Sequence, residues 1–159
     1  MREKISRIYV DTTVVSGMFD HHMPERVEQA RLFWNDVSSG KFVIIASDIL
    51  REELNNAPLH VQEYFAALPK SQIEWIASTD ESDNLAERYV TGDGIGASSV
   101  NDRKHVALAT VARADVIVSW NCKHIVKLNR IHRYNAINML HGYPQIEIRT
   151  PYEVINDET

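Results

Sequence analysis

Short apolar runs alternate with amphipathic segments along the whole chain. Residues 5–10 predict a first strand that ends in an apolar run. Residues 42–46 are apolar throughout, which is typical of a parallel strand covered on both faces. Residues 73–77 and 116–120 predict two further strands, and residues 146–148 predict an edge strand. The segments between them carry helical patterns. Strands that alternate with helices predict an α/β fold with a mainly parallel central sheet.

Proline, glycine and serine residues predict where several helices begin and end. Pro24 occupies the favoured first position of a helix that Gly40 closes. Ser47 follows the second apolar run and can cap the next helix. Pro58 begins a further helix, which continues to about Leu68.

The second half of the chain carries similar signals. Ser78 and Glu81 have the spacing of a capping box, in front of a helix that ends near residue 92. Residues 91–99 are rich in glycine, but neither a preceding strand nor a terminal lysine makes them a phosphate-binding loop. We interpret them as a mobile loop near the functional site. Ser99 can cap the following helix, and a last long helix reaches about Leu140.

Length and composition predict a soluble protein of one domain, residues 1–159. The chain is 44% hydrophobic and 25% charged, and no apolar run approaches the roughly 18 residues of a membrane span. The N-terminus leads into a strand, so no signal peptide is expected. A single cysteine, Cys122, excludes an internal disulfide and fits the cytoplasm. The net charge of -5 argues against a generic basic nucleic-acid coat, but an acidic site filled by metal remains compatible with a nuclease.

Three acids stand at junctions between the predicted elements. Asp11 ends the first strand and is followed by Thr12 and Thr13, while Glu53 and Asp102 lie near the starts of helices. In parallel sheets, ligands bind at the carboxyl ends of the strands. Three carboxylates and a hydroxyl there can hold one or two Mg²⁺ or Mn²⁺ ions and place a water for attack on a phosphodiester.

Each of these residues also has a purely structural interpretation. Asp11 could simply end a strand, and Glu52 rather than Glu53 could face inward. Asp102 could favour its helix terminus electrostatically. His105 could assist Asp102 from one turn away, although a buried histidine with ordinary structural partners is the commoner case.

Four segments, in their order and spacing, resemble the PIN-domain family of metal-dependent ribonucleases. They are residues 10–13, 46–54, 101–109 and 118–124, and the similarity extends over residues 8–126. Within the family, the chain looks most like the small single-domain toxins of bacterial type II toxin–antitoxin pairs, which are VapC-like. The resemblance implies a three-layer α/β/α PIN-like fold around a mainly parallel sheet.

The resemblance also implies the site and its partners. Asp11, Glu53 and Asp102 would be the catalytic, metal-binding acids, with Thr13 as a supporting hydroxyl and Mg²⁺ or Mn²⁺ as cofactor. A fourth acid often occupies the family position near Asn121, where asparagine offers only a neutral oxygen. The expected partners are an RNA substrate, a cognate antitoxin protein and a second copy in a homodimer, without a membrane.

A basic segment follows the predicted site. Residues 121–135 carry four cationic side chains and no acid: Lys123, Lys127, Arg130 and Arg133. This segment could bind RNA beside the acidic site, solvate a helix face, or meet an acidic antitoxin tail.

Other functional classes fit the sequence less well. A phosphoacceptor signalling domain needs an aspartate after the third strand, and none follows Ala77 directly. A haloacid-dehalogenase-type phosphatase needs a second aspartate at position 13, where Thr13 stands. The stronger alternative is a catalytically weakened PIN-like module that binds RNA or protein, and Asn121 motivates it.

Overall fold

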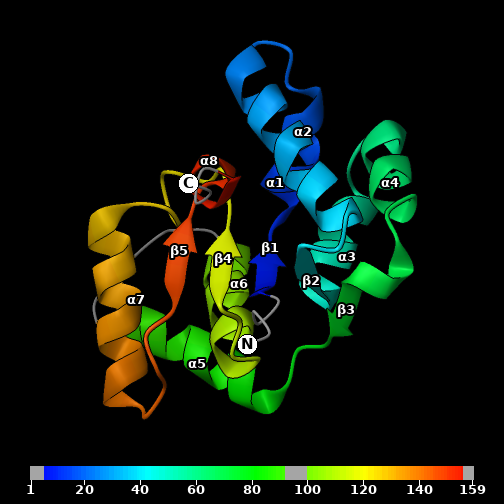
Figure 1. The fold of residues 1–159 in the computed structure, drawn as a ribbon. Coiled ribbons are helices and arrows are strands. Elements are labelled where there is room, and N and C mark those ends of the chain that lie inside the picture. Colours follow the sequence, from blue (N-terminus) through cyan, green and yellow to red (C-terminus); the bar gives the residue numbers. More distant parts are fainter. Residues whose placement is uncertain (1–5, 92–99, 156–159) are drawn as a thin grey trace, which may run out of the picture.

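A five-stranded parallel sheet forms the centre of the computed structural model, which describes residues 6–91 and 100–155 (Figure 1). Its strand order is β3-β2-β1-β4-β5, and every neighbouring pair is parallel. The predicted parallel sheet is therefore confirmed, including the edge position of the last strand. The strands are β1 (Ser6–Val10), β2 (Phe42–Ser47), β3 (Ile73–Ile76), β4 (Val116–Val118) and β5 (Glu147–Arg149).

Helices connect the strands and cover both faces of the sheet (Figure 1). Core contacts place α5, α6 and α7 on one face and α1, α2, α4 and α8 on the other, while α3 contributes to both core clusters. This arrangement is the three-layer α/β/α fold that the sequence predicts. The helices are α1 (Thr12–Ser16), η1 (Gly17–Phe19), α2 (Pro24–Ser38), α3 (Asp48–Asn55), α4 (Leu59–Ala66), η2 (Lys70–Gln72), α5 (Asp80–Thr91), α6 (Val100–Val111), α7 (Leu128–Leu140) and α8 (Pro151–Ile155).

The pleat of β1 divides the core into two clusters. Ile8 packs on one side with Trp34 of α2, whereas Tyr9 packs on the other side with Tyr89 and Tyr134. All five side chains are fully buried. Side chains alternate between the two faces of a strand, so the consecutive buried apolar residues Ile8, Tyr9 and Val10 of β1 require helices on both faces.

The chain changes direction across the sheet between β1 and β4. β2 and β3 extend the sheet on one side of β1, and β4 and β5 extend it on the other side. Ligands of such sheets bind in the crevice at the carboxyl ends of the strands on either side of this point. Asp11 follows β1 there, and residues 119–121 follow β4, so the fold places both segments at one edge.

The predicted capping box of Ser78 and Glu81 is wrong by one residue. The reciprocal pair is Thr79 and Ser82, whose backbone N–H groups donate to each other's hydroxyl at 2.9 and 3.1 Å. Ser78 instead donates its N–H and its hydroxyl to the carboxylate of Asp48, at 3.0 and 2.9 Å. A tertiary contact with α3 therefore takes the residue that local spacing favours as a cap.

Several boundaries differ slightly from the prediction. The fourth strand ends at Val118, Pro58 precedes its helix as the N-cap, and the short helices α1 and α8 were not predicted. Most of the glycine-rich segment and the predicted Ser99 cap lie outside the described residues. No helix in residues 6–91 or 100–155 is long and apolar enough to cross a membrane.

Candidate functional site

Asp11 lies at the carboxyl end of β1, where its carboxylate turns inward and makes no cap bond to α1. Only 3% of the residue is exposed. Its Oδ1 accepts from the Thr13 hydroxyl and its Oδ2 from the Ser119 hydroxyl, both at 2.6 Å. Burial raises the pKa of Asp11, although the charge of His105 and these two hydrogen bonds oppose the rise. The Thr13 hydroxyl also accepts from the Trp120 N–H at 2.9 Å, which ties α1 to the end of β4.

Glu53 is the acid of α3 that faces the site, whereas the neighbouring Glu52 is exposed. Its Oε1 accepts from the Thr12 hydroxyl at 2.5 Å and from Nε2 of His105 at 2.7 Å. Its Oε2 accepts from the amide of Asn101 at 3.3 Å. Burial raises the pKa of Glu53, but the contacts from His105, Thr12 and Asn101 together outweigh burial and hold the pKa below its ordinary value.

A buried chain of hydrogen bonds connects Glu53 to the start of its own helix. The Nδ1 of His105 lies 2.6 Å from the Tyr9 hydroxyl, which lies 2.8 Å from the Ser47 hydroxyl. Ser47 is the N-cap of α3 and accepts from the Leu50 N–H at 3.2 Å. His105 is 1% exposed, and both of its ring nitrogens have partners. It is therefore a core histidine whose two ring nitrogens are both hydrogen-bonded, and its acidic partner is Glu53 rather than Asp102.

Asp102 stands in the first turn of α6 and faces the segment that follows β4. Its Oδ1 accepts from the Asn121 amide at 3.0 Å, while the amide oxygen of Asn121 accepts from the His124 N–H at 3.1 Å. Burial raises the pKa of Asp102, and the charge of Glu53 adds to the rise, whereas His124 and His105 lower it. Asn121 therefore orients Asp102 through its nitrogen.

The three predicted acids are electrostatically connected through Glu53. Its charge raises the pKa of both Asp11 and Asp102, so the carboxylates disfavour each other's ionised forms. Among the described residues, no group of three or more His, Cys, Asp or Glu side chains is arranged to hold a metal ion. Hydrogen bonds from hydroxyl, amide and imidazole groups hold each of the three carboxylates in place without a cation.

The donor chemistry at this edge of the sheet nevertheless fits a hard divalent cation. A carboxylate offers about four lone-pair sites. The contacts above occupy two on Asp11 and three on Glu53, and Asn121 occupies one on Asp102. Mg²⁺ takes oxygen ligands, keeps several waters, and needs only one or two carboxylates. Unused carboxylate lone pairs beside mutually repelling charges meet that requirement.

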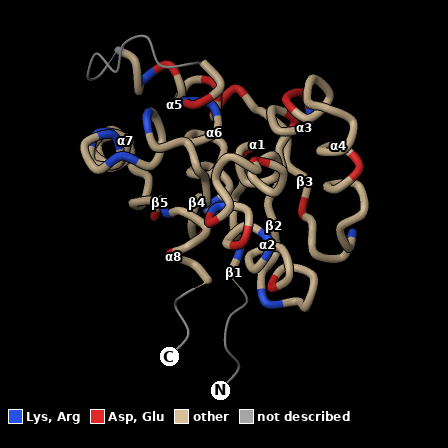
Figure 2. Tube along the Cα trace, turned by 90° about the horizontal axis from the view of Figure 1, so that it is seen from above, with Lys and Arg blue, Asp and Glu red and all other residues tan. Residues whose placement is uncertain are grey.

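The four residues of the predicted basic patch are not equivalent in the structure. Lys123 lies in the turn after β4, and Lys127 is the N-cap of α7; both are exposed. Arg130 is half-buried, and its buried Nη1 has no hydrogen-bond partner among the described residues. Arg133 is exposed further along α7. The view onto the carboxyl ends of the strands shows basic residues on α7 (Figure 2).

Several residues of the site were not assigned a role from the sequence. Ser119, Thr12 and Asn101 bind the acids directly, while Tyr9 and Ser47 act through His105. Ser119 and Asn101 both occur in segments that resemble the family motifs, so their positions were marked although their partners were not. Tyr9 carries a detectable signal as well, because a tyrosine inside a buried strand needs a hydrogen-bond partner for its hydroxyl.

Comparison with known proteins supports the fold. No family model matches the chain, and no curated protein matches it in sequence. Among solved structures, the chain is similar to one in the crystal structure of VapBC2 from Rickettsia felis bound to a DNA fragment from their promoter. The two chains are 13% identical with a TM-score of 0.53, and the match covers 91% of this chain and 98% of that one. The similarity confirms the predicted PIN-like fold: this chain has the fold of that VapBC2 chain.

Proposed function

We propose that the protein is a metal-dependent endoribonuclease that cleaves RNA phosphodiester bonds at the carboxyl edge of its sheet. The observation that carries this proposal is the convergence of Asp11, Glu53 and Asp102 from three separate elements. The segment after β4 binds both Asp11 and Asp102, through Ser119 and Asn121, and α6, which carries Asp102, binds Glu53 through His105. Acids whose charges oppose each other in a partly buried site favour a divalent cation. A metal-binding site of this kind fits a protein that hydrolyses RNA better than a protein that only binds RNA.

The residues around the acids have distinct positioning roles in this proposal. Thr13 and Ser119 fix the two oxygens of Asp11, and Asn121 fixes Asp102. His105 and Thr12 fix Oε1 of Glu53, which leaves Oε2 directed toward Asn101. Asp11, Glu53 and Asp102 would hold Mg²⁺ or Mn²⁺, which supplies Lewis acidity at the scissile phosphate when bound.

We further propose that the chain is the VapC-like toxin of a toxin–antitoxin pair. The similar solved chain comes from a VapBC2 assembly, and the present chain covers almost all of it. A cognate antitoxin and a second copy of the chain are accordingly its proposed protein partners. Co-expression with the adjacent open reading frame, followed by purification of a stable complex, tests this assignment.

The activity is tested with the purified full chain and single-stranded RNA. Cleavage should require added Mg²⁺ or Mn²⁺, stop when EDTA is added, and resume when the metal is restored. The alternative function is a catalytically weakened module. Two observations favour it: Oε1 of Glu53 already accepts two hydrogen bonds, and position 121 carries an amide instead of a carboxylate. RNA binding without cleavage at any concentration of either metal would support that alternative.

Asn121→Asp should make the site depend more strongly on a divalent cation. The change removes the donor to Asp102 and places a second carboxylate beside it. Without metal, we expect the melting temperature to fall by about 3–12 °C, since a lost hydrogen bond to a charged group costs roughly 1.5–3 kcal/mol. Added Mn²⁺ should restore it, with a lower half-maximal concentration than in the wild type. Asn129→Asp, on the exposed surface of α7, is the control. An unchanged metal titration would place residue 121 outside the metal environment.

Lys123→Gln/Lys127→Gln should weaken RNA binding and reduce its dependence on salt. Both lysines are exposed in the segment that joins β4 to α7, which also holds Asn121, the hydrogen-bond partner of Asp102. Each lost contact to a single-strand phosphate should reduce the slope of log affinity against log salt by roughly 0.7. The affinity should be measured in an Asp11→Asn background, where RNA stays intact. Lys41→Gln/Lys70→Gln removes the same charge before β2 and β3, at the opposite edge, and should leave the slope unchanged.

A further inference from the structure

Buried side-chain nitrogens without hydrogen-bond partners gather in the segment that follows β4. In residues 6–91 and 100–155, the buried side-chain nitrogen or oxygen atoms that lack a partner are Trp120 Nε1, His124 Nδ1 and Arg130 Nη1. Trp120 Nε1 packs against Gly17, where an added Cβ would lie only 3.1 Å from it, so the indole leaves no room for a ligand. Buried polar atoms are nearly always paired with protein, with water or with a bound ion. The other two nitrogens therefore need a partner that the described chain does not supply.

Hydrogen bonds connect both residues to the environment of Asp102. The Asn121 amide donates to Asp102 at 3.0 Å and accepts from the His124 N–H at 3.1 Å. The carbonyl of His124 accepts from the Tyr134 hydroxyl at 2.9 Å, and Arg130 lies one helical turn before Tyr134 on the same side of α7. Burial raises the pKa of Tyr134 to about 12, while the charge of Arg130 lowers it and that of Asp102 raises it. The guanidinium and the carboxylate therefore both lie near the Tyr134 hydroxyl.

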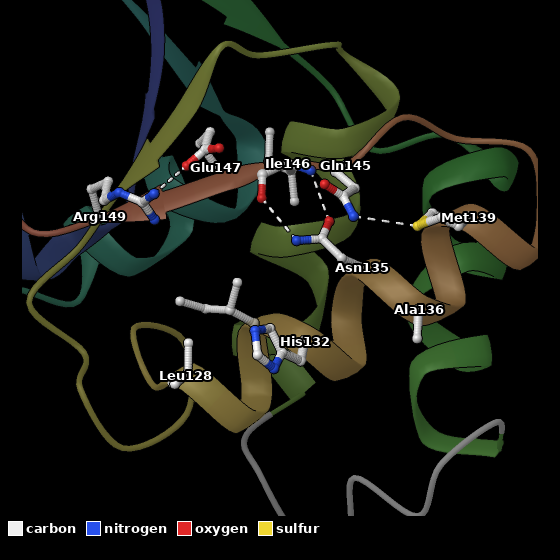
Figure 3. Close-up of a pocket in the computed structure, with 10 residues that line it drawn as sticks. Leu128, His132, Asn135, Ala136, Met139, Gln145, Ile146, Glu147 and Arg149 are labelled. Carbon is white, nitrogen blue, oxygen red and sulfur yellow. Dashed lines mark hydrogen bonds and ion pairs between the residues drawn. The ribbon is translucent and has the colours of Figure 1, made fainter.

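Arg130 faces the body of the protein and not the groove between α7 and β5. Figure 3 shows that groove, which Leu128, His132 and other residues line; neither Arg130 nor Tyr134 belongs to its lining. Tyr134 packs edge to face against Tyr89 of α5, with ring centroids 4.9 Å apart. The side of α7 that carries Arg130 therefore faces the helices of the sheet's own layer, among them α6 with Asp102.

The chemistry of the two nitrogens favours an oxygen-rich anion. A guanidinium N–H can only donate, and Nδ1 of histidine donates when it carries the proton. Arg130 forms no ion pair with an acid in the described part of the chain, and its own segment, residues 121–146, contains no acid. Both residues are partly exposed, so rotation of either side chain can present its nitrogen to a ligand. A guanidinium matches the geometry of a phosphate group especially well.

We propose that Arg130 and His124 bind a phosphate group of the RNA substrate beside Asp102. The proposal rests on the proposed nuclease function, because it places a substrate phosphate next to one of the acids that would hold the cation. Arg130 would donate Nη1 to a phosphate oxygen, and His124 would donate its protonated Nδ1. These are directional hydrogen bonds, which fix the position of the RNA on the site, whereas the exposed Lys123 and Lys127 would act mainly through their charge.

Thermal unfolding of the full chain tests the site with inorganic phosphate as the probe. Phosphate stabilises many folds weakly by exclusion from their surface, so the quantity of interest is the difference between variants in sodium phosphate and in sodium chloride of equal ionic strength. The wild type should gain more from phosphate than Arg130→Gln or His124→Phe, because a ligand of the folded state raises the melting temperature. Arg113→Gln removes the same charge from an exposed position before β4 and should keep the full gain. Equal gains in the wild type and in Arg130→Gln would overturn the proposal.

RNA binding measures the same contact on the proposed substrate. In the Asp11→Asn background, Arg130→Gln should weaken binding of single-stranded RNA about tenfold to a hundredfold, the loss expected for hydrogen bonds to a charged group. Arg130→Lys should recover only part of this loss, since lysine keeps the charge but not the planar donors. Full recovery by lysine would show that charge alone acts at this position and would overturn the hydrogen-bonded site.

The two measurements also separate this site from the proposed nuclease. A protein that cleaves no RNA, but whose gain from phosphate depends on Arg130, would retain the anion site and lose the nuclease function. A protein whose RNA cleavage and RNA affinity are unchanged by Arg130→Gln would retain the nuclease function and lose this site.

Discussion

Asp11→Asn should bind RNA but cleave it at least about a hundredfold more slowly than the wild type at saturating Mg²⁺ or Mn²⁺. The amide keeps the size of the side chain but removes the charge that a cation would neutralise. The fold should survive, since the amide oxygen can still accept from one of the hydroxyls of Thr13 and Ser119, and the other hydroxyl can accept from the amide NH2 group. Single-turnover cleavage of an end-labelled RNA measures the effect.

Thermal unfolding of the same variant separates loss of chemistry from loss of structure. Burial raises the pKa of Asp11, so its ionised form weakens the fold at neutral pH. In metal-free buffer, Asp11→Asn should therefore melt no lower than the wild type. Asp83→Asn, on the exposed surface of α5, removes a charge away from the site and should leave cleavage unchanged. Full cleavage by Asp11→Asn would exclude Asp11 from the catalytic group.

The centre of the sheet was predictable because β2 and β4 consist almost wholly of apolar runs and β1 ends in one. Such runs need cover on both faces, and the helical segments between them provide it. The short helix α1 was missed for the opposite reason. Its sequence contains adjacent β-branched residues, which have poor helix propensity, and the burial of Val14 and Val15 rather than propensity holds it. Tertiary packing of this kind leaves no local signal.

The acids of the candidate site were predictable as types and positions, but their partners were not. Ser119 binds Asp11 across 108 residues of sequence, and His105 binds Glu53 across 52. Which hydroxyl or ring nitrogen meets which carboxylate depends on side-chain directions that only the packed structure fixes. The choice of Glu53 over Glu52 is of the same kind, because it depends on the rotation of α3 against the sheet.

His105→Phe should destabilise the fold, in contrast to Asp11→Asn. It removes the donor to Oε1 of Glu53 and one of the two partners of the Tyr9 hydroxyl. Losing a hydrogen bond to a half-buried carboxylate costs roughly 1.5–3 kcal/mol, which corresponds to about 3–12 °C for a chain of this size. His132→Phe, at an exposed position on α7, is the matched control and should melt near the wild-type temperature.

The pH dependence of this effect should identify Glu53 as the group through which His105 acts. A carboxyl whose pKa is lowered in the folded state stabilises the fold above its ordinary pKa, here 4.5, and that stability is lost as the pH falls through the lowered value. Without His105, burial should dominate and raise the pKa of Glu53. The difference in melting temperature between the two proteins should therefore be largest near neutral pH and narrow below pH 4.5.

A double-mutant cycle with Glu53→Gln tests the connection itself. If His105 stabilises the fold through the charge of Glu53, then His105→Phe should cost less in the Glu53→Gln background than in the wild type. Strictly additive losses would mean that His105 contributes only packing and its bond to Tyr9. A coupled result would show that the chain from Ser47 through Tyr9 and His105 holds Glu53 in place before any cation binds. Glu53 would then already be ordered in the metal-free fold, so a bound cation would not have to fix its side chain. In this way buried core residues would support the proposed metal-dependent cleavage.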